Sequence, residues 1–214
     1  MNARRAWLAG ATGVVGGYCL DALLADPAYD AVHTFARRSL SRIDAKLMTH
    51  TIDFNRLAAM PAPPAVDDAY CCLGTTMRQA GSRDAFERVD YDYVCAFAQL
   101  ALRAGASQFL LVSAVGADAR SSVYYSRIKG RTEDAVRALP FPTVHLFRPS
   151  LLMGPREEHR GGEAFSKTLA PLLAPLLIGP LAKYRPVHAR DVALRMIAVA
   201  KQAQSGRHIH YFTE

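Results

Sequence analysis

Two side chains that could move a proton lie one helical turn apart in the segment SSVYYSRIKGRTEDAV, residues 121–136. Tyr125 is followed four residues later by Lys129, and this spacing puts both on one face of a helix. A free phenol is a poor base at neutral pH, but a nearby ammonium favours the phenolate. The pattern is therefore typical of an acid–base pair. The alternative is two exposed side chains on an ordinary helix.

Position in the chain favours the catalytic interpretation. Ser113 ends the apolar segment QFLLVSA, which is typical of a buried strand, and the helix with Tyr125 follows that strand. In a doubly wound sheet, the carboxyl ends of the strands face the ligand crevice. Ser113 would hold a substrate oxygen by a hydrogen bond, and Tyr125 would supply the proton.

A glycine-rich turn lies near the start of the chain, in GATGVVGG. It follows the short apolar segment RAWLA and precedes a stretch with helical spacing of apolar residues. Glycine allows a tight turn, a pyrophosphate can approach its bare backbone, and the helix N-terminus offers free N–H groups. This context predicts a dinucleotide site, with a turn that only packs helix on strand as the alternative. The expected contacts are Gly10, Thr12, Gly13, Val14, Val15 and Gly16.

The end of the second predicted strand, TFARRSL, indicates which dinucleotide binds. An NAD site prefers a carboxylate there, to hold the ribose 2′-hydroxyl. Arg37 and Arg38 stand at that place, and a guanidinium suits a 2′-phosphate because its planar fork donates two hydrogen bonds. The sequence therefore predicts NADP(H) in preference to NAD(H). A solvated pair of loop arginines is the alternative.

Other strand ends should complete the cofactor groove. Asp53 and Phe54 end the third predicted strand, where we expect the adenine ring, and Lys129 is placed to hold the nicotinamide ribose. The segment after the fourth strand should line the groove with Leu73, Gly74, Thr75 and Thr76. Each of these could equally be an ordinary strand-end turn.

The elements that position these residues alternate between strand and helix. Apolar segments typical of strands precede or follow helical patterns, such as the long amphipathic segment 82–104. Such alternation predicts an α/β fold, a Rossmann-type doubly wound parallel sheet. The alternation stops after Leu151, so we expect residues 151–185 to form a small C-terminal lobe on the substrate side.

Composition narrows the function classes. The 214 residues are half hydrophobic, which suits one domain over 1–214, and the net charge is +7 without a dense basic tract for nucleic acid. The apolar segment 169–181 is short and interrupted by prolines, so no membrane span is expected. Four cysteines without CxxC spacing, and no signal-peptide pattern, favour the cytoplasm. His208 and His210 lack a third ligand in register, so no metal is expected.

Six segments in fixed order carry a family likeness: FARRSL, CCLGTT, VDYDYV, VSAVGAD, YYSRIKG and FRPSLLMGPR. Together they resemble the atypical short-chain dehydrogenases/reductases, and most closely the Tat-interacting oxidoreductase group. The resemblance implies NADPH binding, a catalytic triad of Ser113, Tyr125 and Lys129, and Arg148 near the nicotinamide. Asp90 stands where the superfamily usually has an asparagine. Since a carboxylate cannot donate as an amide does, the usual proton relay is altered.

These observations predict an NADP(H)-binding oxidoreductase that transfers hydride between the cofactor and a small carbonyl/alcohol substrate. Two alternatives remain: a non-catalytic NADPH-binding regulator or redox sensor, and an epimerase that uses bound cofactor transiently. The sequence identifies neither the substrate nor the direction of reaction. The helical segment 82–104 could pair with a copy of itself, which leaves a homodimer open.

Overall fold

The computed structural model describes residues 3–61, 65–154, 179–202 and 204–213. Within these ranges a seven-stranded parallel sheet has the order β3-β2-β1-β4-β5-β6-β9, and β7 pairs with β8 in a separate two-stranded sheet. The strands are β1 (Arg4–Ala9), β2 (Tyr29–Ala36), β3 (Leu47–Thr51), β4 (Asp68–Cys71), β5 (Gln108–Val112), β6 (Thr143–Phe147), β7 (Leu152–Met153), β8 (Val187–His188) and β9 (Gly206–His210). The predicted Rossmann-type sheet is confirmed.

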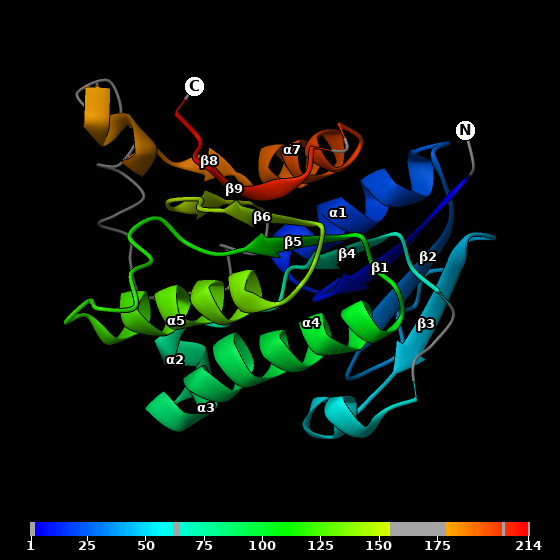
Figure 1. Ribbon diagram of the computed structural model, residues 1–214, viewed down its shortest axis with the longest axis horizontal. Helices are drawn as coiled ribbons and strands as arrows, with labels where there is room; N and C mark the ends of the chain where they lie inside the picture. The colour runs from blue at the N-terminus through cyan, green and yellow to red at the C-terminus, as the bar shows by residue number, and fades with distance from the viewer. Residues whose placement is uncertain (1–2, 62–64, 155–178, 203, 214) are drawn as a thin grey trace.

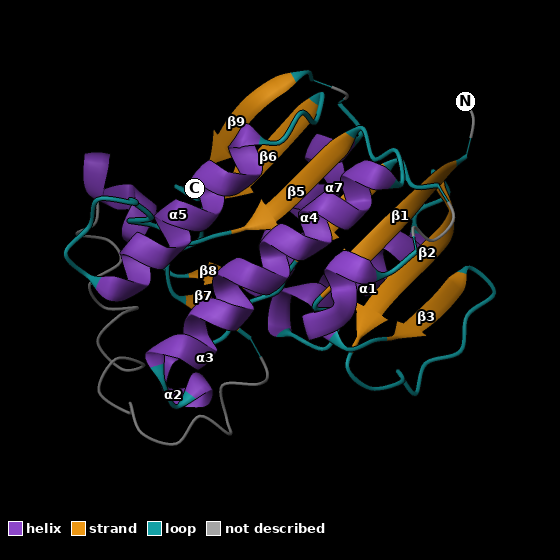
Figure 2. Ribbon diagram, turned by 60° about the horizontal axis from the view of Figure 1, so that its bottom comes forward, coloured by secondary structure: helices purple, strands orange, loops and turns teal. Residues whose placement is uncertain are grey.

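Helices cover both faces of this sheet (Figure 1). The helices are α1 (Val14–Ala25), α2 (Met77–Ala80), α3 (Arg83–Glu87), α4 (Tyr93–Arg103), α5 (Tyr124–Ala138) and α7 (Ala189–Ala200). The helices α1 and α7 lie together on one face, while α4 and α5 lie on the other (Figure 2). Short 3-10 turns occupy Phe54–Ala59 and Gly179–Tyr184.

The central strands are buried on both sides, which explains their continuous apolar sequences. In β1, Leu8 packs into the cluster under α1 and α7, whereas its neighbour Trp7 packs into the cluster under α4. The Trp7 ring lies 4.8 Å from the Phe35 ring and 6.3 Å from the Phe97 ring, measured between centroids. Alternate residues of one strand thus bind a helical layer to each face.

The helical segment predicted over 82–104 is present, but it is not one regular α-helix. A π-helical turn at Arg88–Asp92 separates α3 from α4. Such turns add a residue to the helical repeat and are frequent at functional sites. The lobe predicted over 151–185 falls largely on residues 155–178, outside the described residues.

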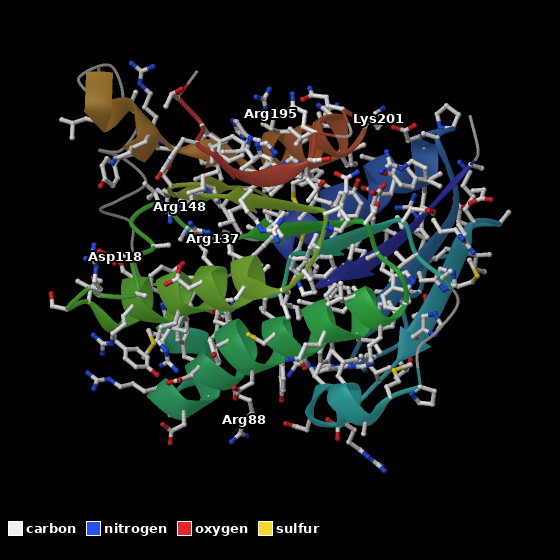
Figure 3. The ribbon with its side chains drawn as sticks, viewed as in Figure 1. Arg88, Asp118, Arg137, Arg148, Arg195 and Lys201 are labelled. Carbon is white, nitrogen blue, oxygen red and sulfur yellow. The ribbon has the colours of Figure 1, made fainter. Side chains whose placement is uncertain are left out.

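Two side chains mark the two ends of the sheet. Arg148, directly after β6, lies where the strands finish, and Lys201, directly after α7, lies at the opposite end (Figure 3).

None of the helices in the described ranges has both the length and the hydropathy that a bilayer crossing requires.

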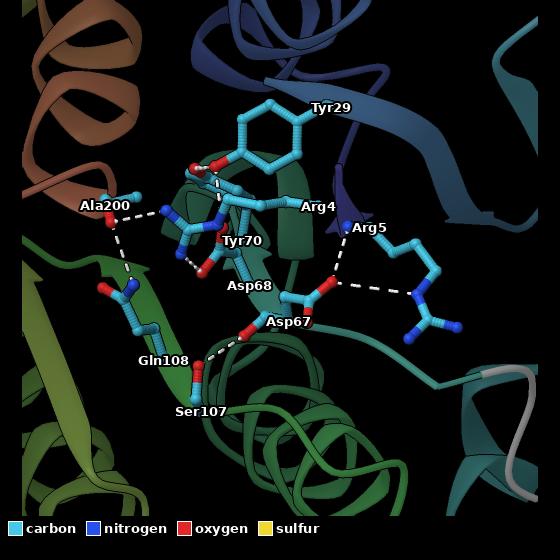
Figure 4. A network of polar contacts seen from close by, with 9 residues as sticks. All are labelled: Arg4, Arg5, Tyr29, Asp67, Asp68, Tyr70, Ser107, Gln108 and Ala200. Carbon is cyan, nitrogen blue, oxygen red and sulfur yellow. Dashed lines mark hydrogen bonds and ion pairs between the residues drawn. The ribbon is translucent and has the colours of Figure 1, made fainter. Parts of the chain in front are cut away.

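A buried polar network ties the amino end of the sheet together (Figure 4). Asp68 is fully buried; its carboxylate accepts from the Arg4 guanidinium at 2.5 Å and from the Tyr29 hydroxyl at 2.7 Å. The Tyr29 oxygen also lies 2.7 Å from the Tyr70 hydroxyl. Arg4 donates in addition to the Ala200 carbonyl at 3.1 Å, which joins the end of α7 to β1.

Candidate active site

The glycine turn has the conformation that a dinucleotide site needs. Gly10 follows β1 with φ of +86°, and a Cβ there would lie 2.5 Å from the Cys72 carbonyl oxygen. A Cβ on Gly16 would collide with the Gly10 carbonyl oxygen. Gly13 is the N-cap of α1, with no side chain capping the helix and no acid in its first turn. The first N–H groups of α1 therefore remain available for an anion.

A shallow hollow of about 250 Å³ borders this turn, and residues of the turn and of the first turns of α1 line it. Its walls include Thr12, Gly13 and Val14, while Val15 faces the core instead. The bare backbone and the uncapped helix fit a pyrophosphate. The fold thus brings the predicted glycine-turn residues to the carboxyl end of β1.

Arg37 and Arg38 follow β2 directly, and β2 pairs with β1 up to Ala9, just before the glycine turn. Both arginines are exposed. Within the described part of the chain neither side chain has a hydrogen bond or an ion pair, whereas Arg42 is paired with Asp21. The two guanidinium groups are therefore available at the place where a ribose phosphate is expected.

Asp53 and Phe54 have local roles in this structure. The Asp53 carboxylate caps the following 3-10 turn by accepting from the Asn55 backbone N–H at 3.0 Å and the Asn55 amide at 2.9 Å. Phe54 is buried with its ring centroid 5.3 Å from that of Tyr93. An adenine contact from either residue stays a prediction.

The segment after β4 approaches the site from the other side. Gly74 is exposed, and the Thr75 backbone N–H donates to Asp90 at 2.8 Å. Thr76 caps α2 by accepting from the Gln79 backbone N–H at 3.1 Å. Leu73 packs at the margin of the core under α4. The backbone around Gly74 thus lines the site, while the Thr76 hydroxyl has a structural use.

Ser113 lies just beyond β5 with a side chain suited to binding a ligand oxygen. Its backbone N–H donates to the Phe147 carbonyl at 2.7 Å, which fixes its position. Its hydroxyl is buried, with the residue 6% exposed, and has no hydrogen-bond partner among the described residues. Leaving a buried hydroxyl unpaired costs roughly 1–3 kcal/mol, so such atoms are usually tied to function.

The two adjacent tyrosines of α5 have different surroundings. The Tyr124 hydroxyl donates to Glu87 and to the Arg83 carbonyl, each at 3.0 Å, so this side chain fastens α5 to α3. Tyr125 packs against Phe86 with ring centroids 5.5 Å apart, and its hydroxyl has no hydrogen bond to the described residues. The geometry favours Tyr125 over Tyr124 as the reactive phenol.

Lys129 is buried and paired. Its ammonium lies 2.7 Å from the carboxylate of Asp90, which is fully buried on the π-helical turn. Burial alone would lower the pKa of Lys129, but Asp90 and, after it, the Tyr125 phenol more than offset burial and raise that pKa above its ordinary value. The surroundings of Lys129 therefore favour its ammonium form beside Tyr125.

Arg148 is held by other side chains. Its guanidinium makes two hydrogen bonds to Glu133 on α5, at 2.9 Å and 2.5 Å, and a third to the Tyr211 hydroxyl at 2.8 Å. Glu133, with nearly no exposure, raises the pKa of Arg148 further by these bonds. Arg148 thus joins β6 to α5, and the predicted nicotinamide contact is not tested by this arrangement.

Gly130 is a site residue that sequence reasoning missed. A Cβ there would collide with the backbone of Asp118 and Ala119, so the loop between β5 and α5 rests directly on the helix. This contact fixes the depth at which α5 presents Tyr125 and Lys129. The glycine next to Lys129 was the only signal in the sequence, and it has no meaning without the packed loop.

Comparison with known proteins places this chain in a family. The chain is 37% identical to protein HTATIP2 of Rattus norvegicus over 167 residues, covering 76% of this chain and 69% of that protein. It is 36% identical over 170 residues to the mitochondrial protein fmp52 of Emericella nidulans, covering 76% and 73%. The chain belongs to the HTATIP2/fmp52 family of atypical short-chain dehydrogenases/reductases. No protein-family profile matches the chain.

Solved structures support the fold of this HTATIP2/fmp52 family member. A short-chain dehydrogenase/reductase family oxidoreductase from Burkholderia thailandensis has a TM-score of 0.71 at 18% identity, covering 98% of this chain and 91% of that chain. The Bordetella bronchiseptica enzyme WbmH, solved with NAD⁺, has a TM-score of 0.73 at 13% identity, covering 100% and 76%. At these identities the likeness shows the Rossmann fold alone.

Proposed function

We propose that the chain is an NADP(H)-dependent oxidoreductase acting on a small carbonyl/alcohol pair. The observation that carries this proposal is the buried hydroxyl of Ser113, which has no hydrogen-bond partner among the described residues. Ser113 follows β5, and the next helix along the chain bears Tyr125 and Lys129. A hydroxyl kept dry and unpaired at the carboxyl end of a central strand is suited to a substrate oxygen.

Ser113, Tyr125 and Lys129 each have a separate role in the proposed reaction. A bound NADPH supplies the hydride that the carbonyl carbon receives. Ser113 donates its hydroxyl proton in a hydrogen bond to the carbonyl oxygen and so orients it. Tyr125 transfers its phenolic proton to that oxygen, which completes the alcohol, and then recovers a proton from solvent. Lys129, as an ammonium, stabilises the phenolate left on Tyr125 and would also hold the ribose hydroxyls of the cofactor.

The preference for NADP(H) rests on Arg37 and Arg38, which are exposed and unpaired within the described ranges. Arg37→Glu should weaken NADPH binding about 10- to 100-fold, because a charge-assisted hydrogen bond contributes roughly 1.5–3 kcal/mol. NADH binding should change by less than about threefold. Fluorescence titration with both nucleotides measures this. Arg120→Glu makes the same charge change on a side chain that is 94% exposed and should leave both affinities unchanged.

Turnover is tested with the wild-type protein, a panel of small aldehydes and ketones, and the absorbance of NADPH. Consumption of NADPH with at least one carbonyl, and less with NADH, is the expected result. An equal preference in Arg37→Glu and wild type would contradict the cofactor assignment, even if turnover were found.

A regulator that binds the nucleotide without turnover is the second candidate, and Asp90 is the observation that favours it. Its carboxylate stands where the superfamily's asparagine would donate a hydrogen bond, and it is paired with Lys129. Such a protein would bind NADPH tightly and consume none with any carbonyl.

The substrate-side partner, a homodimer and a cytoplasmic location stay predictions. The fungal relatives are named as mitochondrial proteins, so a mitochondrial location competes with the cytoplasmic one. Fractionation of cells that carry the tagged chain decides between them.

A further inference from the structure

Asp90 is the residue on which two separate segments converge. One carboxylate oxygen lies 2.7 Å from the Lys129 ammonium on α5, and the other accepts from the Thr75 backbone N–H at 2.8 Å. Gly74 lies over this pair, since a Cβ there would be 3.4 Å from the Asp90 oxygen and 3.5 Å from the Lys129 nitrogen. One buried carboxylate therefore holds the turn after β4 and the catalytic lysine together.

The π-helical turn fixes the backbone of Asp90 as firmly as its side chain. The Asp90 carbonyl accepts from the Thr132 hydroxyl at 2.8 Å, and that hydroxyl also lies 2.9 Å from the Ile128 carbonyl. Both residues belong to α5 and flank Lys129. The carboxylate and the ammonium are thus held by elements that are themselves connected beside the ion pair.

The surroundings also explain why an aspartate serves here and an asparagine would not. Donors approach both oxygens of Asp90: an ammonium on one side and a backbone N–H on the other. A carboxylate offers two acceptors, whereas an amide offers one acceptor and one donor. An asparagine would turn its NH₂ group toward Lys129 or toward the Thr75 N–H, leaving one buried donor facing another.

We propose that Asp90 is a positioning residue that clamps Lys129 and keeps its ammonium charged as half of a buried ion pair. The groups that face Lys129 are Asp90 from the π-helical turn, Tyr125 from its own helix and Cys71 from the end of β4. Among these described groups, Asp90 is the one that forms an ion pair with Lys129. The effect on turnover rests on the proposed function; the clamp itself does not.

The clamp is tested without a substrate by competitive acetylation. Wild type and Asp90→Asn are treated with acetic anhydride over a pH series, and mass spectrometry compares Lys129 with Lys201. A buried lysine without its counter-charge loses its proton more easily. In Asp90→Asn the Lys129 profile should therefore move down by at least about one pH unit, a tenfold gain in labelling near about pH 9. Lys201, paired with Asp26 at the surface, should not move.

Asp134→Asn is the matched control, because it removes the same charge from an exposed position on α5. It should leave the Lys129 profile where it is in wild type. If the dependence of Lys129 acetylation on pH is the same in Asp90→Asn as in wild type, the proposal is overturned, because groups other than Asp90 would then keep Lys129 protonated.

A second measurement separates this proposal from the proposed function. With 4-nitrobenzaldehyde and 9,10-phenanthrenequinone as carbonyl probes, Asp90→Asn should lose kcat at alkaline pH in parallel with the labelling shift. Its affinity for NADPH should stay within about threefold of wild type. If the labelling of Lys129 shifts but wild type turns over neither carbonyl, the role of Asp90 is supported and the proposed oxidoreductase function is contradicted. If Asp90→Asn turns over a carbonyl and the alkaline side of its kcat–pH profile matches that of wild type, Asp90 has no part in catalysis.

If Asp90→Asn does not fold, the double variant Asp90→Asn/Lys129→Met decides. Removing one partner of a buried pair leaves an uncompensated charge, whereas removing both does not. The double variant should therefore fold and resist urea better than Asp90→Asn alone. A double variant that is no more stable than the single variant would contradict the clamp.

Discussion

The two ends of the sheet carry the same three kinds of group in opposite states of completion. At the amino end Asp68 is paired with an arginine and also binds the hydroxyl of Tyr29. At the carboxyl end Asp90 is paired with Lys129, but the Tyr125 hydroxyl has no hydrogen bond to the described residues. Each aspartate is fully buried. Only at the amino end does the tyrosine close the network.

This difference distinguishes a polar network that stabilises the fold from a set of groups available to bind a ligand. At the amino end burial raises the pKa of Tyr29, and Asp68 beside it adds to that shift, so this phenol keeps its proton. At the carboxyl end the buried Ser113 hydroxyl has no hydrogen-bond partner in the described ranges, and the half-buried Tyr125 makes no hydrogen bond there through its hydroxyl. Folded proteins rarely leave buried polar atoms unpaired except where a ligand completes them.

Removing the two phenols should give opposite phenotypes. Tyr125→Phe should lower turnover of any accepted carbonyl by about 10²- to 10⁴-fold, since a positioned proton donor contributes that much. Its unfolding free energy should stay within about 0.5 kcal/mol of wild type, because no described hydrogen bond is lost. Steady-state NADPH consumption and urea unfolding measure the two effects.

Tyr29→Phe is the matched control for that experiment. It removes the donor to Asp68 and the neighbour of the Tyr70 hydroxyl, both buried, so it should cost about 2 kcal/mol of stability. Turnover below the unfolding midpoint should be unchanged. If both variants lose turnover alike, or both lose stability alike, the division between the two ends is wrong.

Breaking the ion pair at the amino end should have the largest effect on stability. Arg4→Met leaves the Asp68 charge buried without its partner and should cost about 3–5 kcal/mol. Adding Asp68→Leu should recover part of that loss, because the buried charge is then gone. Lys201→Met breaks an ion pair in which the lysine side chain is 45% exposed and should cost less than about 1 kcal/mol. Unfolding in urea compares the three variants.

The sequence predicts the parts of this arrangement that depend on local spacing. The glycine turn and the shared face of Tyr125 and Lys129 follow from residues three or four apart. The Asp90 pairing could not be predicted, because an ordinary α-helix over 82–104 does not specify the π-helical turn that aims its carboxylate. Nor could the amino-end network, in which Arg4 reaches the Ala200 carbonyl across 196 residues of chain.

For Arg148 the sequence predicts the position of the residue but not the group that its side chain binds. Its place after the sixth strand suggested a cofactor contact, and that place was predicted well. What its guanidinium binds depends on Glu133, a buried acid on α5 that no sequence pattern distinguished from a surface acid. Spacing along the chain locates a side chain, whereas its partner is set by packing between elements.

Acid should act on the two halves of the sheet in opposite directions. The ring nitrogens of His145 on β6 and His210 on β9 lie 3.0 Å apart. Burial, and after it His210 and His208, lowers the pKa of His145 to about 4, while burial, and after it Arg195 and His208, lowers the pKa of His210 to about 4. The unfolded chain then binds more protons than the fold between about pH 6.5 and 4, so stability is lost as pH falls. Burial instead raises the pKa of Asp68 to about 6, so the fold binds the extra proton there and stability is gained.

From pH 7 to about pH 5 the two histidines should remove roughly 2 kcal/mol, allowing for the solvent that reaches His210, while Asp68 returns about 1 kcal/mol. Wild type should therefore lose about 1 kcal/mol, and Asp68→Asn about twice as much, because it cannot take up the proton. His210→Gln should flatten the acid loss, since it removes one titrating ring and the charge that ring presents to His145. Urea unfolding at the two pH values measures all three proteins. Equal acid slopes in wild type and Asp68→Asn would mean that Asp68 takes up no proton in this range, so the buried carboxylate of the amino-end network would stay charged down to about pH 5.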